Sequence, residues 1–584
     1  MMPTHAEPLR RATGAPGDAP FWRRPRHLVL LALALLLYVV PLFTVPLLDP
    51  DEGRYGEIPR EMLASGDYVT PRLDGTLYFE KPPLHYWLTA SALRLLGNRE
   101  VGVRFWTALF GLGTAGLLVR MALALAPRRT AWLAGGLLLA SPYFFSLSHV
   151  ATLDMTLTFF VTLALVGFWM AQDGAAERRR RLAGWAALFG GSALAVLAKG
   201  LVGIVLPGGV IFFYLLFSGR WRLLREVPWV SGTMLFLAVA VPWHVLVARR
   251  NPSFVQFYFV HEHFLRYTTP IAERGEPFWY FFAVLAAGCL PWIGLLGRLP
   301  RLFAGSGFRR WREENGALLF LFCWIGFVVL FYSTSHSKLA PYVLPAAPPL
   351  ALLAAMLVGG PATASARWSV GERVALGVSA AIVLSVGAAA ALATTGLLPA
   401  SVPPLGEAHA LHPWALLLSL AAAAAGGALL LRSLKERPGE IAGPTLRASA
   451  LLCAALWALV AIEGPTRSSR QIADVLASRL EPGDRVVCFG GYRQSLPFYL
   501  ERFVESAEPH KDLAFGVSQL SPEQRRERFP TVEELKSWWE SDRRVYVVVD
   551  RQLERLRAKG IDGGTVLLPG KRMQLVVNQP PRRP

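Results

Sequence analysis

Acidic, basic and aromatic residues with the chemistry of a transfer site occur in several short, widely separated segments of this sequence. The segment Asp51-Glu-Gly-Arg-Tyr is followed by Glu80-Lys81-Pro-Pro, and Asp154 interrupts a long apolar run. A carboxylate can act as a general base or orient a substrate, and a lysine can stabilise the charge of a leaving phosphate. These residues are candidates for one catalytic site if the fold brings them together.

Further cations and a phenol accompany these acids. Lys199 precedes a glycine at the end of an apolar run, Arg266 follows a pair of histidines, and Lys338 and Tyr342 share a later polar segment. Lysine, arginine and tyrosine beside apolar surface are typical of a site for a lipid that carries a phosphate. A simpler interpretation also exists for Lys199, which can extend its ammonium from a helix end to the membrane surface.

The acids have simpler interpretations as well. Residues 49–80 hold eight acids, which would suit a solvated loop, and Glu80 beside Lys81 can be an ordinary surface ion pair. Asp154 is different, because a carboxylate within an apolar run is costly and is functional by default, unless an ion pair uses it to stabilise the helices.

Two histidines lie two residues apart, at His261 and His263. Such a pair can bind a metal together with a carboxylate, since imidazole and carboxylate are common zinc ligands. Histidines that bind no metal explain the pair equally well. No glycine-rich phosphate loop, dinucleotide fingerprint or sugar-nucleotide motif is present, so we expect no nucleotide cofactor.

The composition indicates the elements that must position these residues. Of the 584 residues, 53% are hydrophobic and only 17% are charged, against about 25% charged in soluble proteins. About 20 apolar residues suffice to cross a bilayer. The sequence therefore predicts a polytopic α-helical membrane protein with about 13 spans, and the expected spans are 28–48, 101–125, 131–149, 152–171, 183–198, 200–218, 228–247, 278–297, 316–333, 340–358, 374–395, 413–431 and 446–463.

The net charge of +19 would suggest nucleic acid as the partner of a soluble protein. Here arginines precede the first span. If the spans alternate in direction from a cytoplasmic N-terminus, nearly all of the dense basic loops lie on the cytoplasmic side, as the positive-inside rule requires. We therefore expect a lipid bilayer and no nucleic acid. The N-terminus is predicted to be cytoplasmic, and the candidate site residues share the opposite face.

The same pattern predicts the organisation of the chain. Residues 1–27 form a cytoplasmic tail, 28–465 the membrane domain, and 466–584 a small α/β domain on the outer face. Periodicity and proline placement predict two interfacial helices, at 54–66 and 83–97.

The outer domain has alternating strand and helix patterns. Strands are predicted near 485–489 and 545–549, and helices near 469–480 and 532–541. Two roles stay open for this domain: it packs against and modulates the membrane domain, or it binds a ligand.

The membrane motifs resemble those of the lipid-dependent GT-C glycosyltransferases. The residues that carry the resemblance are Asp51-Glu-Gly-Arg-Tyr, Glu80-Lys-Pro-Pro, Leu153-Asp154-Met and His336-Ser-Lys-Leu followed by Pro341-Tyr342. Among these enzymes the sequence is most similar to the aminoarabinose (ArnT-like) transferases, which are related to the protein mannosyltransferases. Over the outer domain, the resemblance rests only on size and placement.

The resemblance implies a donor in which 4-amino-4-deoxy-L-arabinose is linked to undecaprenyl phosphate. It also implies transfer at the periplasmic face of the bacterial inner membrane, with a lipid A phosphate as acceptor and polymyxin resistance as the outcome. A relative that moves another sugar to protein, glycan or lipid is the first alternative. A transporter or flippase for a lipid-linked sugar is an alternative of another class, which would need charges near the membrane midplane and inverted repeats.

Roles for single residues follow from the resemblance together with the residue types. Asp51 would orient the acceptor or balance charge if the acceptor is a phosphate, and would act as general base if it is a hydroxyl. The complete set comprises Asp51, Asp154 and Lys81 as catalytic residues, Lys81, Arg266, Tyr342, Lys199 and Lys338 around the donor phosphate, and Glu80, His261 and His263 as ligands of a structural divalent metal such as zinc.

Overall fold

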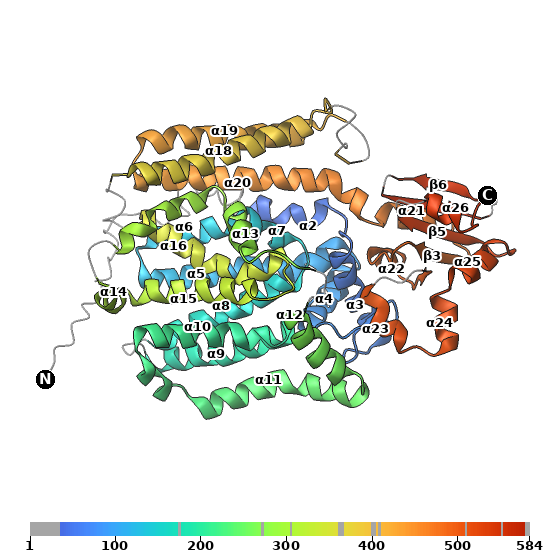
Figure 1. Cartoon of the computed structure of the whole chain (residues 1–584), viewed down its shortest axis with the longest axis horizontal. Helices are drawn as coiled ribbons and strands as arrows, with labels where there is room; N and C mark the ends of the chain where they lie inside the picture. The colour runs from blue at the N-terminus through green and yellow to red at the C-terminus, as the bar shows by residue number, and fades with distance from the viewer. Residues whose placement is uncertain are drawn as a thin grey trace.

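Long apolar helices packed side by side form most of the molecule, and a small mixed sheet lies at one end of them (Figure 1). The computed structural model describes residues 35–172, 177–269, 274–303, 307–359, 367–398, 405–406, 410–507, 511–550, 553–570 and 572–578. The predicted N-terminal tail, 1–27, and the start of the first expected span lie outside these residues.

Nine helices in the described part of the chain are long and apolar enough to cross a membrane. They are α5 (Glu100–Leu125), α8 (Leu153–Ala171), α9 (Arg178–Lys199), α11 (Trp229–Arg250), α15 (Gly316–Ser333), η6 with α16 (Ala340–Gly359), α18 (Val370–Ala393), α19 (Pro413–Lys435) and α20 with η7 (Pro438–Arg467). The polytopic α-helical fold class is confirmed by these helices.

The expected count of thirteen spans is not confirmed. Two apolar stretches are bent pairs rather than straight helices, α6 (Arg128–Leu139) with α7 (Pro142–His149) at 62° and α13 (Tyr280–Gly288) with η5 (Trp292–Phe303) at 115°. Two more apolar helices, Leu35–Thr44 and α10 (Val202–Ser218), are shorter than a full span. Hydropathy averages over a window, so it detects these apolar stretches but not the bends inside them.

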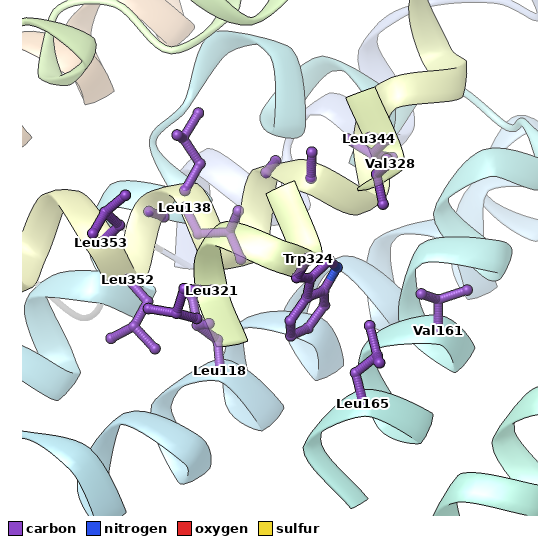
Figure 2. Close-up of a cluster of buried hydrophobic side chains, with 14 of the residues drawn as sticks. Leu118, Leu138, Val161, Leu165, Leu321, Trp324, Val328, Leu344, Leu352 and Leu353 are labelled. Carbon is purple, nitrogen blue, oxygen red and sulfur yellow. The ribbon is translucent and has the colours of Figure 1, made fainter. Parts of the chain in front are cut away.

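Leucine, valine and tryptophan side chains from α5, α6, α8, α15 and α16 fill the centre of the bundle (Figure 2). Trp324 lies among them and is fully buried. Its indole nitrogen donates a hydrogen bond to the carbonyl oxygen of Pro345 at 2.9 Å, because a buried N–H without water needs a protein acceptor.

Glycines bring α8 and α9 into direct backbone contact. A Cβ on Gly167 would lie 2.6 Å from the Gly184 carbonyl oxygen, and one on Gly191 would lie 3.0 Å from that of Phe160. Small residues of this kind allow close helix packing within a membrane. The consequence for the site is that the start of α8, with Asp154, is held beside the end of α9, with Lys199.

Helix α3 (Asp51–Ser65) is anchored by a fully buried ion pair. Arg104 of α5 donates from Nε to Glu52 Oε1 at 2.7 Å and from Nη2 to Glu52 Oε2 at 2.5 Å. Glu52 also accepts hydrogen bonds from the backbone N–H groups of Leu48 and Ala151. One carboxylate thereby joins the start of α3, the long helix α5 and the turn that leads to Asp154.

The predicted helix at 54–66 corresponds to α3, which begins three residues earlier and ends one residue earlier, and most of its residues are buried. Residues from Glu52 to Met62 are buried, because the membrane helices pack on one side of α3 and the outer domain packs on the other. The interpretation of residues 49–80 as a solvated acidic loop is therefore wrong. The second predicted helix corresponds to α4 (Leu84–Leu96), and between the two lies a hairpin of β1 (Arg72–Leu73) and β2 (Thr76–Leu77).

The outer domain is built on a five-stranded sheet in the order β4-β3-β5-β7-β6. Strand β3 pairs in parallel with β4 and β5, whereas β7 pairs antiparallel with β5 and β6. The strands are β3 (Arg485–Phe489), β4 (Glu505–Ser506), β5 (Val545–Asp550), β6 (Thr565–Pro569) and β7 (Met573–Val577), and the helices are α21 (Arg470–Ala477), α22 (Ser495–Leu500), α23 (Lys511–Ser518), α24 (Pro522–Arg528), α25 (Val532–Trp539) and α26 (Leu553–Ala558).

The outer domain is bonded directly to the segment before α3. The Asp49 carboxylate accepts hydrogen bonds from the Ser495 backbone N–H at 2.7 Å, the Ser495 hydroxyl at 2.9 Å and the Ser469 hydroxyl at 3.2 Å. Gly53 faces the backbone of Ser495 so closely that a Cβ there would clash. Of the two roles that the sequence left open for this domain, packing against the membrane domain is thus observed.

Replacing Arg104 with Met should destabilise the protein strongly. Removing one partner of a buried ion pair leaves the other charge uncompensated, which costs about 3–5 kcal/mol. Arg120, exposed on the same helix, provides the matched control, and Arg120→Met should change stability little. Thermal unfolding of the purified protein in detergent measures both, and equal unfolding temperatures for the two variants would contradict the anchoring role.

Acids buried where the two domains meet make stability depend on pH. Burial raises the pKa of Asp74 to about 7 and that of Asp49 to about 6, against a usual 3.8 for both. The folded protein therefore binds protons more tightly than the unfolded chain, so stability should fall as pH rises from about 4 to about 7.

Substituting Asp74 with Asn should reduce this fall, since one unit of pKa difference is worth about 1.4 kcal/mol. Asparagine also tolerates the left-handed backbone of this position, where φ is 51°. Unfolding temperatures measured between pH 5 and pH 8 test the expectation. The exposed Asp542→Asn variant should keep the wild-type slope, and an unchanged slope in Asp74→Asn would refute the assignment.

Candidate functional site

Lys81 is placed by the short connection between β2 and α4. Its ammonium donates to the Glu80 carbonyl oxygen at 2.7 Å and lies 3.2 Å from Glu262 Oε2. Pro82 and Pro83 follow directly, and Pro83 caps the start of α4, so the lysine lies at a fixed helix entrance. Burial lowers the pKa of Lys81 below its usual value, although the nearby Glu262 carboxylate opposes this effect.

Glu262 joins the cations of the site. Its Oε2 also accepts a 2.6 Å hydrogen bond from Arg266 Nη1, which lies 3.6 Å from Glu80 Oε2. Burial alone would raise the pKa of Glu262, but the positive charges of Lys81 and Arg266 have the larger effect and hold this pKa at about 2. The carboxylate is therefore ionised at neutral pH and fixes both cations in place.

A second ion pair connects the start of α8 with the end of α9. The Lys199 ammonium is hydrogen-bonded to Asp154 Oδ1 and lies 4.4 Å from the centre of the Tyr342 ring. Tyr342 also interacts electrostatically with Lys81 and Arg266. The phenol thus joins the two groups of charges into one cationic cluster, which we define as Lys81, Lys199, Arg266 and Tyr342.

Asp51 lies at the first turn of α3, with 54% of its side chain exposed. Its carboxylate oxygen is 3.5 Å from Arg54 Nη2, and Arg54 also donates to the hydroxyl of Tyr78. Tyr55, one residue further along α3, interacts electrostatically with both Asp51 and Glu80. Asp51 is therefore an accessible acid near the Glu80 side of the cationic cluster.

Lys338 and His263 have other partners. The Lys338 ammonium donates to the Ser335 carbonyl oxygen of its own loop at 2.6 Å. In His263, Nδ1 contacts the Tyr258 carbonyl oxygen at 2.7 Å and Nε2 contacts the Leu201 backbone N–H at 3.3 Å. Both ring nitrogens of this histidine are already engaged by the backbone.

The three predicted metal ligands do not form a ready coordination site. His261 is half-buried, stacks on Phe257 and lies 3.4 Å from Glu262, while Glu80 is close to Arg266. Across the described residues, no group of three or more histidine, cysteine, aspartate or glutamate side chains could hold a metal ion. The metal site stays a prediction.

Glu262 was missed in the sequence, although a signal for it was present. It lies between the two histidines and four residues before Arg266, the spacing at which a glutamate and an arginine pair on one helix face. Here the helix is the π-helix η3 (Gln256–Leu265), and the i to i+4 ion pair still forms across its end.

Two family models match the chain. The dolichyl-phosphate-mannose-protein mannosyltransferase model covers residues 26–258, and the aminoarabinose transferase C-terminal domain model covers residues 472–578. Similar sequences include an undecaprenyl phosphate-alpha-4-amino-4-deoxy-L-arabinose arabinosyl transferase from Erwinia tasmaniensis, 33% identical over 61% of this chain, and one from Pseudomonas aeruginosa, 37% identical over 57%. These matches span 64% and 59% of the relatives' own lengths.

Among solved structures, ArnT from Cupriavidus metallidurans bound to undecaprenyl phosphate is similar over nearly the whole chain. The TM-score is 0.79 at 29% identity, with 95% of this chain and 98% of that one covered. The resemblance to the aminoarabinose transferases is confirmed. An archaeal oligosaccharyltransferase from Archaeoglobus fulgidus is similar to this chain in fold, at a TM-score of 0.50 and 13% identity.

The arrangement suits departure of a phosphate from a sugar. Charge that develops on a leaving phosphate is stabilised by donors that are already in position, since they need no reorganisation during the reaction. The cationic cluster has this property, because Glu262 and Asp154 hold its lysines and arginine and pack them beside Tyr342. Asp51, exposed near the edge of the cluster, can face a second substrate.

Replacing Glu262 with Gln should lower the rate of transfer more than the affinity for a lipid phosphate. The substitution removes a negative charge next to Lys81 and Arg266, so attraction for an anion persists while the two cations lose their common anchor. Misplacing such groups by about 1 Å can cost about 100-fold in rate. The exposed Glu276→Gln variant should behave as wild type, and a Glu262→Gln variant with an unchanged kcat would contradict the anchoring role.

Proposed function

We propose that this protein transfers 4-amino-4-deoxy-L-arabinose from undecaprenyl phosphate to a phosphate of lipid A, at the periplasmic face of the bacterial inner membrane. The observation that carries the proposal is the cationic cluster, in which Glu262 holds Lys81 and Arg266, and Asp154 holds Lys199. Helix α4, which flanks Lys81, and helix α12 (Arg266–Thr268) lie toward the outer domain (Figure 1). The proposal is supported by the fold shared with a transferase solved in complex with undecaprenyl phosphate.

In this reaction the cationic cluster binds the donor phosphate and stabilises it as it leaves the sugar carbon. Arg266 and Lys81 supply charge-assisted hydrogen bonds, and the phenol of Tyr342 supplies a neutral donor. An acceptor phosphate is already ionised at pH 7, so Asp51 orients the incoming group or balances the positive charge of the sugar. With a hydroxyl acceptor, Asp51 is instead placed to remove the proton.

The orientation in the membrane is part of the same proposal. Arg309, Arg310 and Arg312 lie on α14 (Phe308–Glu314), at the end of the bundle opposite the outer domain (Figure 1). Arginine-rich ends are retained in the cytoplasm, so the cluster and the outer domain face the periplasm. Lipid-linked donor and lipid acceptor can both reach a site at this interface by diffusion within the membrane.

A transferase that moves another sugar is the second candidate, and the mannosyltransferase family match over residues 26–258 favours it. Such an enzyme would keep the cationic cluster for the polyprenyl phosphate and differ where the sugar and acceptor bind. The mass of the product distinguishes the two, because each sugar adds its own mass to the acceptor.

Purified protein incubated with undecaprenyl-phosphate aminoarabinose and lipid A should give lipid A with the added sugar, detected by mass spectrometry. Lys81→Ala should lower kcat/KM by about 100-fold or more, the usual effect of removing a preorganised donor to developing negative charge. Lys435, exposed at the end of α19, is the matched control, and Lys435→Ala should keep full activity. Unmodified lipid A with wild-type protein would refute the acceptor, and undiminished transfer by Lys81→Ala would refute the site.

A further inference from the structure

Helix α23 of the outer domain packs directly onto the segments that carry the site. The ring of Phe515 stacks on Phe257 of η3 with centroids 3.9 Å apart, and it lies 5.8 Å from Phe79, the residue before Glu80. A Cβ on Gly516 would lie 2.6 Å from the Leu77 carbonyl oxygen, so the helix backbone approaches β2 as closely as a glycine permits. The outer domain therefore places α23 in a fixed position beside the site.

One charged side chain of α23 reaches a charged residue of the site. Asp512 Oδ2 lies 2.9 Å from Arg54 Nη2 and accepts a 3.3 Å hydrogen bond from the side chain of Gln494. The same Arg54 nitrogen is 3.5 Å from Asp51 Oδ1. A single guanidinium group is thus shared by two carboxylates, one from each domain, and the carboxylate from the outer domain is the closer of the two.

The two residues of the shorter ion pair, Arg54 and Asp512, are far less exposed than Asp51. Arg54 is 8% exposed and Asp512 is 12% exposed, whereas Asp51 is 54% exposed. Arginine keeps its charge in proteins, and a buried charge needs a partner. Without Asp512, Arg54 would have Asp51 as its nearest carboxylate, and Asp51 would be drawn into a full ion pair.

We propose that Asp512 is a positioning residue for the transfer reaction, which neutralises Arg54 from the outer domain and so leaves the Asp51 carboxylate free to face the substrates. This inference rests on the proposed function. It gives the outer domain a part in the chemistry beyond packing, because the geometry of the site includes one of its side chains.

Other contacts attach the outer domain without involving Asp512. Asp49 bonds to Ser495, and Arg470 pairs with Glu100 at 2.7 Å. These bonds hold the two domains together and do not involve the Arg54 side chain. A change at Asp512 can therefore be tested while the domain stays docked.

The first measurement compares Asp512→Asn with wild type, using undecaprenyl-phosphate aminoarabinose and lipid A. Because Asp51 is not one of the groups that bind the donor phosphate, kcat should fall about tenfold or more, as expected for a misplaced catalytic group, while binding of undecaprenyl phosphate stays within about twofold. Asp512→Glu, which restores the charge, should recover much of the rate. Asp484→Asn provides the control, since Asp484 is an acid of the same domain with little exposed surface, and it pairs with Arg544 rather than with Arg54.

The second measurement repeats the Asp512→Asn change in an Arg54→Gln background. If Asp512 acts through Arg54, the substitution should have no further effect once the guanidinium is gone. A loss of rate that persists in that background, or an equal loss in Asp484→Asn, would overturn the proposal, and so would a normal kcat in Asp512→Asn. Absence of transfer by wild-type protein would instead refute the proposed function, so the two failures are distinguishable.

Discussion

The buried ion pair between Glu52 and Arg104 is the constraint on which the rest of the site depends. Its carboxylate also receives the N–H of Ala151, so it fixes the start of α3 against the turn that leads into α8. Asp51 directly precedes Glu52, and Asp154 lies three residues after Ala151. An ion pair with no exposed surface cannot slide as a solvated one can, since either charge would be left without compensation. One ion pair thereby sets the positions of both Asp51 and Asp154.

Neighbouring residues of the segment Asp51-Glu-Gly-Arg have different functions, because α3 lies between the membrane domain and the outer domain. Glu52 points into the membrane domain and is structural, whereas Asp51 remains accessible. Gly53 has no side chain because the backbone of Ser495 occupies the space, and Arg54 faces the outer domain. A helix with a different contact on each side can hold charges of both signs in a nearly dry environment, because Glu52 finds its partner in α5 and Arg54 finds one in the outer domain.

The sequence was sufficient to place the candidate residues on one face, because span length and the positive-inside rule depend only on composition along the chain. It could also indicate Asp154, since an acid in an apolar run is costly. It could not show that Lys199 neutralises Asp154, because this pairing depends on glycine contacts between α8 and α9. Nor could it show where the side chains of Lys338 and His263 point, because their hydrogen bonds are to backbone groups. The burial of α3 was missed because the residues that cover it, such as Ser495, lie more than 400 positions later.

The distribution of charge follows from the lipid substrates that we propose. A donor anchored in the membrane presents its phosphate at the depth of the interface, so cations there must stay in place without a ligand. Free lysines would extend into water. Glu262 and Asp154 prevent this by pairing with Lys81, Arg266 and Lys199, at the cost of part of the positive charge. The remaining charge is smaller but fixed, and fixed donors stabilise a leaving phosphate better than a larger number of mobile ones, because no free energy is spent on reorienting them as the bond breaks.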